Sequence, residues 1–121
     1  MKRPVVHFEI QSKRAEELQG FYSDLFGWSI SADNPMNYGV VKTLEEGEVG
    51  IDGGIDPSQG EASSVTFYVQ SDDLDASLKK AVDLDANVVM PATTIPAMVT
   101  MALFADRDGN VVGPVHSEVP E

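Results

Sequence analysis

A short stretch of sequence occurs twice in this chain of 121 residues, and it constrains the fold more than any other feature. Residues 6–12, VHFEIQS, are similar to residues 65–71, VTFYVQS, which lie 59 positions later in the chain. The shift lays Val6, Phe8 and Ile10 on Val65, Phe67 and Val69, and it repeats Gln-Ser at the end of the stretch. Because self-similarity at one fixed spacing is the signature of a repeated structural unit, two halves of about 60 residues are expected.

Each copy of this stretch alternates in the way of a β-strand with two different faces. One face is apolar and suits packing under a helix, whereas the other carries polar or aromatic groups. The apolar residues are Phe8, Ile10, Phe67 and Val69, and the residues of the opposite face are His7, Glu9, Thr66 and Tyr68. The sequence therefore predicts the same strand in two places.

A helical pattern follows each strand. Apolar residues recur at spacings of three and four and give each helix one apolar stripe. The stripes are Ala15, Leu18, Phe21, Tyr22 and Leu25 in the first half and Leu74, Leu78, Ala81 and Val82 in the second. We expect Ser12 and Asp72 to cap the two helices and Gly27 to end the first, because short polar residues favour N-caps and glycine favours the C-terminal end.

Three β-prone segments follow each helix, at 28–32, 38–43 and 48–55 and then at 87–90, 98–105 and 111–116. The order is βαβββ twice, which predicts an α+β fold. We expect one domain over residues 1–121, with module one at 1–56, a linker at 57–63 and module two at 64–121. Inside module one, Gly53 and Gly54 indicate either the close approach of another chain or a β-bulge.

The composition excludes several kinds of partner. Eight Lys and Arg against twenty Asp and Glu give a formal net charge of −12, which would repel phosphate backbones and anionic lipids. No apolar run reaches the roughly 20 residues of a membrane-spanning helix, and no signal-peptide pattern opens the chain. Without cysteine, a metal could be held only by His, Asp or Glu. A cytoplasmic protein that binds neither nucleic acid nor membranes is expected.

Several motifs together resemble the vicinal oxygen chelate superfamily, which contains glyoxalases, extradiol dioxygenases and bleomycin-resistance proteins. They are VVHFEIQS leading into FYSDLFGW, the repeat VTFYVQSDDLDASLKKA, and LFADRDGNVVG near the end of the chain. The resemblance covers almost the whole sequence. It implies that the two βαβββ modules form curved mixed sheets around a shared cavity, with the helices outside. The strand alternation agrees, because it aims His7, Glu9, Thr66 and Tyr68 at that cavity.

The resemblance also implies a pattern of metal ligands, of which this sequence keeps one. In the superfamily a metal is typically held by a first-strand residue and by a Glu near the end of the last strand of each half. His7 stands at the first-strand position, but its counterpart is Thr66, and Gly54 and Gly113 stand at the two terminal positions. Because a divalent metal normally needs about three protein donors or more, no cofactor is expected.

One route to a metal site stays open. Glu9 shares the face of His7, and Asp52 lies two residues before Gly54, so these three side chains could form a facial site of one His and two carboxylates. The alternative is that they form a hydrogen-bonded network that lines a pocket.

Two functions of different class follow from these alternatives. In the first, the chain binds a small molecule without a metal, through His7, Glu9, Thr66 and Tyr68, and no catalytic residue is assigned. In the second, it is a metal-dependent lyase, isomerase or dioxygenase of the glyoxalase type, with Glu9 or Asp52 as base. The missing ligands favour the first. A homodimer is expected, because the superfamily often pairs modules between chains as well as within one.

Overall fold

The computed structural model describes residues 2–33, 38–58, 62–95 and 99–117. Its elements follow the order βαβββ twice, so the predicted α+β class and the two modules are confirmed. Module one consists of β1 (Val5–Ser12), α1 (Ala15–Phe26), β2 (Ser29–Ser31), β3 (Gly39–Lys42) and β4 (Gly53–Pro57). Module two consists of β5 (Ser64–Gln70), α2 (Leu74–Asp83), β6 (Asn87–Ile95), β7 (Val99–Ala105) and β8 (Val111–Ser117).

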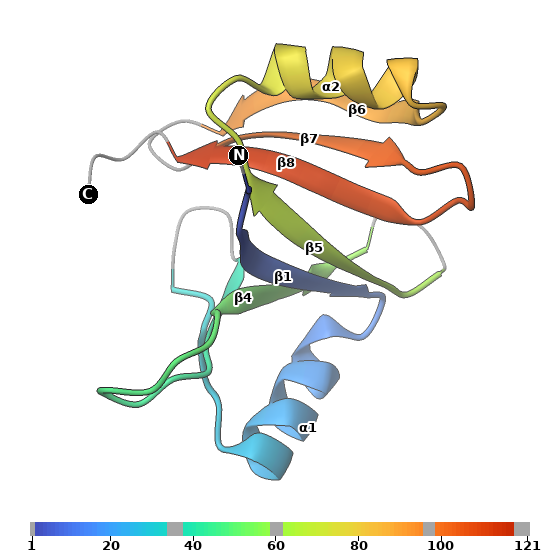
Figure 1. Cartoon of the computed structure of the whole chain (residues 1–121). Coiled ribbons are helices and arrows are strands. Elements are labelled where there is room, and N and C mark those ends of the chain that lie inside the picture. The colour runs from blue at the N-terminus through green and yellow to red at the C-terminus, as the bar shows by residue number, and fades with distance from the viewer. Residues whose placement is uncertain (1, 34–37, 59–61, 96–98, 118–121) are drawn as a thin grey trace. The chain divides into compact units, whose positions relative to one another are not determined.

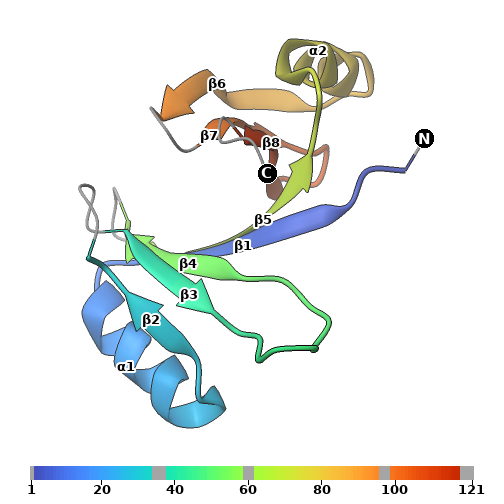
Figure 2. The same ribbon diagram turned by 90° about the vertical axis from the view of Figure 1, so that its left-hand side faces the viewer.

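The two modules use one sheet topology. In module one the strands lie in the order β2, β3, β4 and β1; the first three are antiparallel and β4 runs parallel to β1. In module two the order is β6, β7, β8 and β5, again with one parallel pair between the last strand of the module and its first. Figures 1 and 2 show each helix lying along its own set of strands. The repeat in the sequence is therefore a repeat of a complete structural unit.

The contacts divide the chain into two compact units at slightly different places from the predicted boundaries. One unit is Val6–Thr66, and the other joins the chain from Phe67 onward to the N-terminal residues up to Val5. The N-terminal residues reach the second unit through a hydrogen bond from the Gln70 amide to the Pro4 carbonyl. The boundary between the units falls within β1 and β5. Val5, the first residue of β1, belongs to the unit of module two, and residues 64–66 of β5 belong to the unit of module one.

The core of module one lies between α1 and its sheet. Ala15, Val41 and Ile55 are buried, and Phe8 and Ile10 pack against them, as the alternation of β1 predicts. A hydrogen bond from the Gln19 side chain to the Ile55 carbonyl ties the helix to β4. The helix ends at Gly27, as predicted, with a φ of 73° that glycine adopts without strain.

The core of module two lies between α2 and the outer strands of its sheet. Leu74, Leu78 and Ala102 are buried there, and Phe104 packs against them. The prediction that Phe67 packs under this helix was wrong. Its side chain is 44% exposed, because α2 lies along β6, β7 and β8 rather than over β5.

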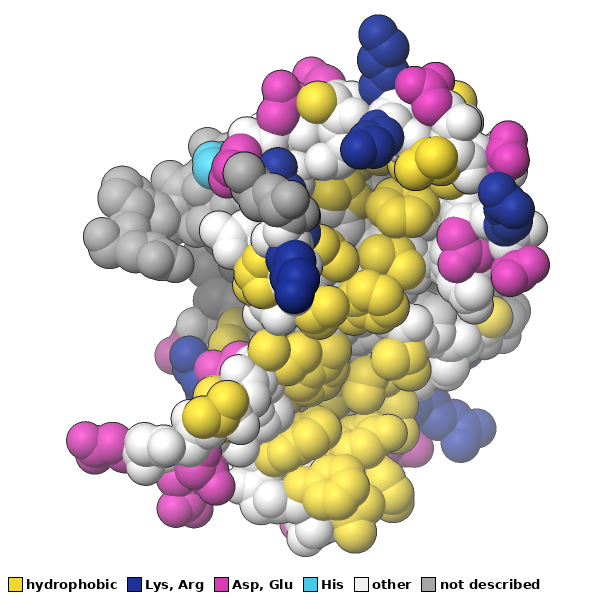
Figure 3. Space-filling model, in the orientation of Figure 1, with side chains coloured by type: hydrophobic (Ala, Val, Ile, Leu, Met, Phe, Trp, Pro, Cys, Tyr) yellow, Lys and Arg dark blue, Asp and Glu magenta, His cyan; other side chains and the backbone are white. Residues whose placement is uncertain are grey.

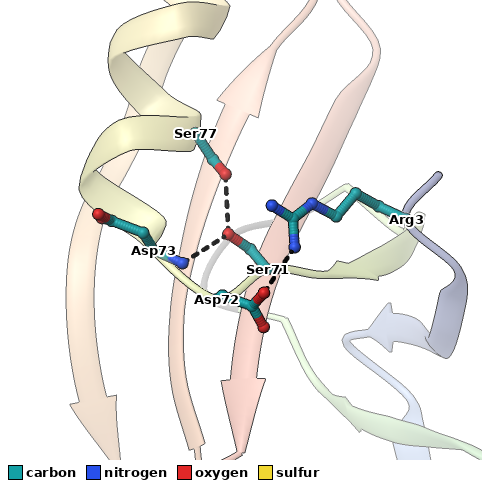
Figure 4. A network of polar contacts seen from close by, with 5 residues as sticks. All are labelled: Arg3, Ser71, Asp72, Asp73 and Ser77. Carbon is teal, nitrogen blue, oxygen red and sulfur yellow. Dashed lines mark hydrogen bonds and ion pairs between the residues drawn. The ribbon is translucent and has the colours of Figure 1, made fainter. Parts of the chain in front are cut away.

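Both predicted N-caps were misplaced by one or two residues. The N-cap of α2 is Asp73, whose carboxylate accepts a hydrogen bond from the Ala76 amide. Asp72 instead forms an ion pair with Arg3 at 3.1 Å, and the Ser71 hydroxyl bonds both Ser77 and the Asp73 amide (Figure 4). α1 has no side-chain cap, since Ser12 is the last residue of β1 and accepts from the Arg14 amide just before the helix.

Candidate functional site

The polar face of β1 carries His7 and Glu9 beside the start of β4. Both side chains are half-buried. In the parallel pairing of the two strands Glu9 lies opposite Gly54, and Phe8 lies opposite Gly53. Paired residues of adjacent strands point to the same side of the sheet, so Gly54 shares the face of His7 and Glu9.

Tyr38, just before β3, completes this group of residues. Its hydroxyl lies 3.0 Å from Nε2 of His7, and the two rings are nearly parallel, with an interplanar angle of 23° and centroids 6.4 Å apart. A Cβ atom added to Gly54 would fall on the Tyr38 hydroxyl and the ring carbon that carries it. Position 54 therefore has to be glycine for the tyrosine to reach the histidine.

Both glycines do have a close neighbour, but it is a side chain of the same module rather than the other chain that was predicted. Phe8 occupies the space beside Gly53 on the core side of β4, and Tyr38 occupies the space beside Gly54 on the polar side. Reasoning from the sequence did not find Tyr38 as the approaching residue. Gly54, a glycine within a strand, was the feature of the sequence that indicated a close neighbour. The sequence does not show which side chain fills the space beside it.

Burial and neighbouring carboxylates set the charge state of this group. Burial lowers the pKa of His7 below its ordinary value, and the charges of Glu9 and Asp52 offset part of that effect. Burial, and then the charge of Glu9, raises the pKa of the Asp56 carboxyl. Around neutral pH the imidazole is therefore mostly uncharged, and the charges that act on it are negative.

Asp52 has a structural task in the same region. Its Oδ1 accepts a hydrogen bond of 2.8 Å from the Thr43 amide, and the Thr43 hydroxyl donates to the Ile51 carbonyl. The Nζ atom of Lys42 lies 3.8 Å from Oδ2 of Asp52. Asp52 therefore holds the segments on either side of the β3–β4 connection together, and it contributes its charge to His7 from that position.

The predicted residues of module two lie on the polar face of β5. Thr66 and Tyr68 are 9% and 4% exposed. Tyr68 pairs with Gly113 of β8, and a Cβ atom at Gly113 would collide with the Tyr68 ring. The structure thus brings His7 together with Glu9, and Thr66 together with Tyr68. That the two pairs line one site stays a prediction.

The residues at the expected metal positions do not fit a metal of the superfamily type. Gly54 and Gly113 offer no donor atom, and in each case a tyrosine of the same module fills the space where a side chain would project. Across the described ranges, no group of three or more His, Asp and Glu side chains is placed to hold a metal ion. His7, Glu9 and Asp52 interact electrostatically without meeting that requirement.

The sequence itself shows the family. A sequence model of the Glyoxalase/Bleomycin resistance protein/Dioxygenase superfamily matches residues 5–113. This chain belongs to that superfamily. The resemblance seen in the sequence is thus confirmed as membership of the superfamily, and the βαβββ repeat that it implies agrees with the observed element order. No curated protein matches the sequence.

Solved structures of the superfamily fold are similar to this chain at low identity. A superfamily member from Vibrio splendidus 12B01 is 16% identical, with 94% of this chain and 98% of that chain covered and a TM-score of 0.62. Methylmalonyl-CoA epimerase from Mycobacterium tuberculosis is 14% identical, with 92% and 85% covered and a TM-score of 0.62. For 2,2',3-trihydroxybiphenyl 1,2-dioxygenase from Sphingomonas wittichii strain RW1 the identity is 14%, the coverage 99% and 43%, and the TM-score 0.62.

These likenesses concern the fold. An epimerase and a dioxygenase are different chemistries on one architecture, so the activity of this superfamily member has to be argued from its own side chains. No helix within the described part of the chain is long and apolar enough to cross a membrane.

Proposed function

We propose that this chain binds a small organic molecule with side chains alone, without the metal of the superfamily. The observation that carries the proposal is the covering of Gly54 and Gly113 by tyrosines, since the superfamily pattern puts carboxylate ligands at these positions. A carboxylate placed at either position would first have to displace an aromatic ring. Phenol hydroxyls offer an uncharged ligand hydrogen bonds instead.

Under this proposal His7, Glu9, Thr66 and Tyr68 bind the ligand, as the strand alternation predicts. Half-burial of His7 and Glu9 supports the role, because a binding group has to be sheltered from water and still reachable. Thr66 and Tyr68 are more deeply buried, at 9% and 4% exposed, and under this proposal they line the base of the site.

The charges near His7 bear on the kind of ligand. The charges of Glu9 and Asp52 act on the imidazole, and burial together with the charge of Glu9 raises the pKa of the Asp56 carboxyl. A ligand with a carboxylate or phosphate at this point would meet like charge. We therefore propose an uncharged or cationic ligand, and we expect anionic compounds to bind more weakly than uncharged analogues of the same shape.

Metal analysis tests the proposal most directly. Protein purified without chelators is measured by mass spectrometry for Ni, Zn, Mn and Fe, together with a His7→Ala variant. We expect far less than one metal per chain in both. A stoichiometric metal in the unaltered protein that is lost on His7→Ala would contradict the proposal and favour the metal-dependent lyase, isomerase or dioxygenase.

A thermal-shift screen tests the binding itself. Matched sets of uncharged, cationic and anionic aromatic compounds are added to the protein, to a Thr66→Val variant and to a Tyr22→Phe control. A compound present at about 100 times its Kd stabilises the folded state by ~2.7 kcal/mol, which raises Tm by several degrees. We expect such shifts for the protein and the control and smaller ones for Thr66→Val. If no compound raises Tm, binding loses its support.

We also propose that two copies associate. Association is supported by three large apolar side chains, Phe21, Leu25 and Phe26, which are 54%, 57% and 59% exposed on α1. Figure 3 shows hydrophobic side chains gathered over the region of this helix. Contiguous exposed apolar surface commonly marks an interface. Light scattering should give the mass of a dimer, and a Phe21→Ser variant should shift the mass toward a monomer.

A further inference from the structure

Three observations meet at Tyr38, a residue that the superfamily pattern does not assign. Its hydroxyl lies 3.0 Å from Nε2 of His7. Its ring runs nearly parallel to the imidazole. Gly54 provides the space for the hydroxyl, because a side chain at that position would overlap it. His7 lies in β1, Gly54 lies in β4 and Tyr38 lies just before β3, so the contact depends on three separate segments of the chain.

We propose that Tyr38 is a positioning residue of the candidate site, which fixes the nitrogen of His7 that carries the proton. A neutral imidazole has one N–H donor and one acceptor nitrogen, and the choice between them is set by the group that one nitrogen meets. A phenol is a better hydrogen-bond donor than acceptor, whereas an unprotonated imidazole nitrogen is a strong acceptor. The Tyr38 hydroxyl therefore donates to Nε2, and the proton of His7 stays on Nδ1.

This inference rests on the proposed function in one respect, namely that His7 contacts the ligand. The phenol oxygen of Tyr38 keeps its lone pairs when its hydroxyl donates a hydrogen bond to His7, so the pair offers the ligand an acceptor that is backed by a fixed imidazole. The nearby carboxylates favour the same kind of partner, a hydroxyl or amine group that donates. Tyr38 thereby acts on binding through His7 and through its own oxygen.

The test reads the tautomer directly and needs no ligand. Long-range proton–nitrogen NMR on protein with ¹⁵N-labelled histidine distinguishes a ring nitrogen that bears a proton from one that does not. The spectra are recorded at a pH where His7 is neutral, and a His116→Gln variant assigns the two histidines. A free imidazole in water favours the proton on Nε2, so the expected Nδ1–H form is an unusual state.

We expect Nδ1–H to dominate for His7 in the unaltered protein and the Nε2–H form to gain population in Tyr38→Phe. That substitution removes one hydroxyl and leaves the ring. Gly54→Ala should produce the same change, because its methyl group displaces the hydroxyl. Gly20→Ala is the matched control, since a Cβ there meets no atom within 4 Å, and it should leave the signals unchanged.

Two results would overturn the inference. One is an Nε2–H tautomer of His7 in the unaltered protein, and the other is a tautomer that is the same in Tyr38→Phe. If Gly54→Ala does not fold, Tyr38→Phe alone decides. Failure of the ligand screen would leave the tautomer result standing, and a wrong tautomer would leave the ligand screen standing. The two proposals therefore fail separately.

Discussion

The two modules cover equivalent glycines with tyrosines taken from different places. In module two, Tyr68 belongs to β5 itself and lies over Gly113 of the neighbouring strand. In module one, Tyr38 lies just before β3 and reaches over Gly54, where its hydroxyl meets His7. One ring is 4% exposed and the other is half-buried.

This difference shows how a duplicated unit can diverge without a change of fold. Both modules keep the parallel pair of first and last strands and a glycine on the polar face of the last strand. Module two has closed this position with a buried ring, and module one has turned it into a polar contact. The backbone is conserved between the halves, whereas the chemistry at its polar face differs.

Core truncations should show the largest contrast between the modules. Val41 and Ile55 in module one are 0% exposed, whereas Leu74 and Leu78 in module two are 7% and 8% exposed. We expect Ile55→Ala to lower the free energy of unfolding by ~4 kcal/mol and Leu78→Ala by ~3 kcal/mol, because the fully enclosed site cannot collapse around the cavity. Urea titration measures both, and a larger loss for Leu78→Ala would reverse the comparison.

Adding a methyl group at Gly54 and at Gly113 should show which of the two tyrosines, Tyr38 or Tyr68, is held more firmly in place. At Gly113 it would meet both the buried Tyr68 ring and the Ala102 carbonyl, so Gly113→Ala should cost ~3 kcal/mol. At Gly54 it would meet the far end of the Tyr38 side chain, which can move, so Gly54→Ala should cost ~1 kcal/mol.

The double variant Tyr38→Ala with Gly54→Ala checks the physical reason. If the cost at Gly54 is the collision with Tyr38, the two changes together should destabilise the protein by less than the sum of the single effects. Strict additivity would mean that the methyl group disturbs something else. Gly20→Ala shows the effect of the same exchange without a collision, because the position is open; inside α1 it should raise the free energy of unfolding by about 0.5–1 kcal/mol.

The helix starts should differ by a smaller amount. Asp73 caps α2 through the Ala76 amide, so Asp73→Ala should cost about 1 kcal/mol. α1 has Arg14 at the corresponding position without a side-chain cap, so Arg14→Ala should change the free energy of unfolding by less than about 0.5 kcal/mol. Equal costs in the two helices would contradict this reading of the caps.

Much of this fold follows from the sequence. The repeat of VHFEIQS and the spacing of apolar residues predict both βαβββ units, and Gly27 predicts the end of α1, because these are local patterns with one structural solution. The caps were less accurate, since Asp72 and Asp73 are equally suitable chemically, and α1, whose N-cap is Arg14, does not use the favourable Ser12 as its cap. The position of Phe67 could not be predicted, because it depends on which strands α2 crosses.

The candidate site was predicted in part for the same reason. The alternation of residues in β1 places His7 and Glu9 on one face, and the glycines at 53 and 54 indicate that another group comes close. The group at Gly54 is Tyr38, sixteen residues earlier in the chain, and its approach depends on the course of the chain before β3. A contact of this kind is set by tertiary structure, and no period or motif encodes it.

The smallest predicted effect is a dependence of stability on pH that belongs to module one. The pKa of His7 is lower in the folded state than in the unfolded chain, because burial disfavours the charged imidazole. Below the ordinary histidine pKa of about 6.5 the unfolded state therefore binds more protons, and the free energy of unfolding falls as the pH is lowered toward the folded pKa. A His7→Gln variant lacks this contribution, so its curve should be flatter between neutral pH and about pH 5. Chemical denaturation at a series of pH values measures the difference. Parallel curves would show that burial of the imidazole has no energetic consequence, and they would remove the main electrostatic distinction between the two modules.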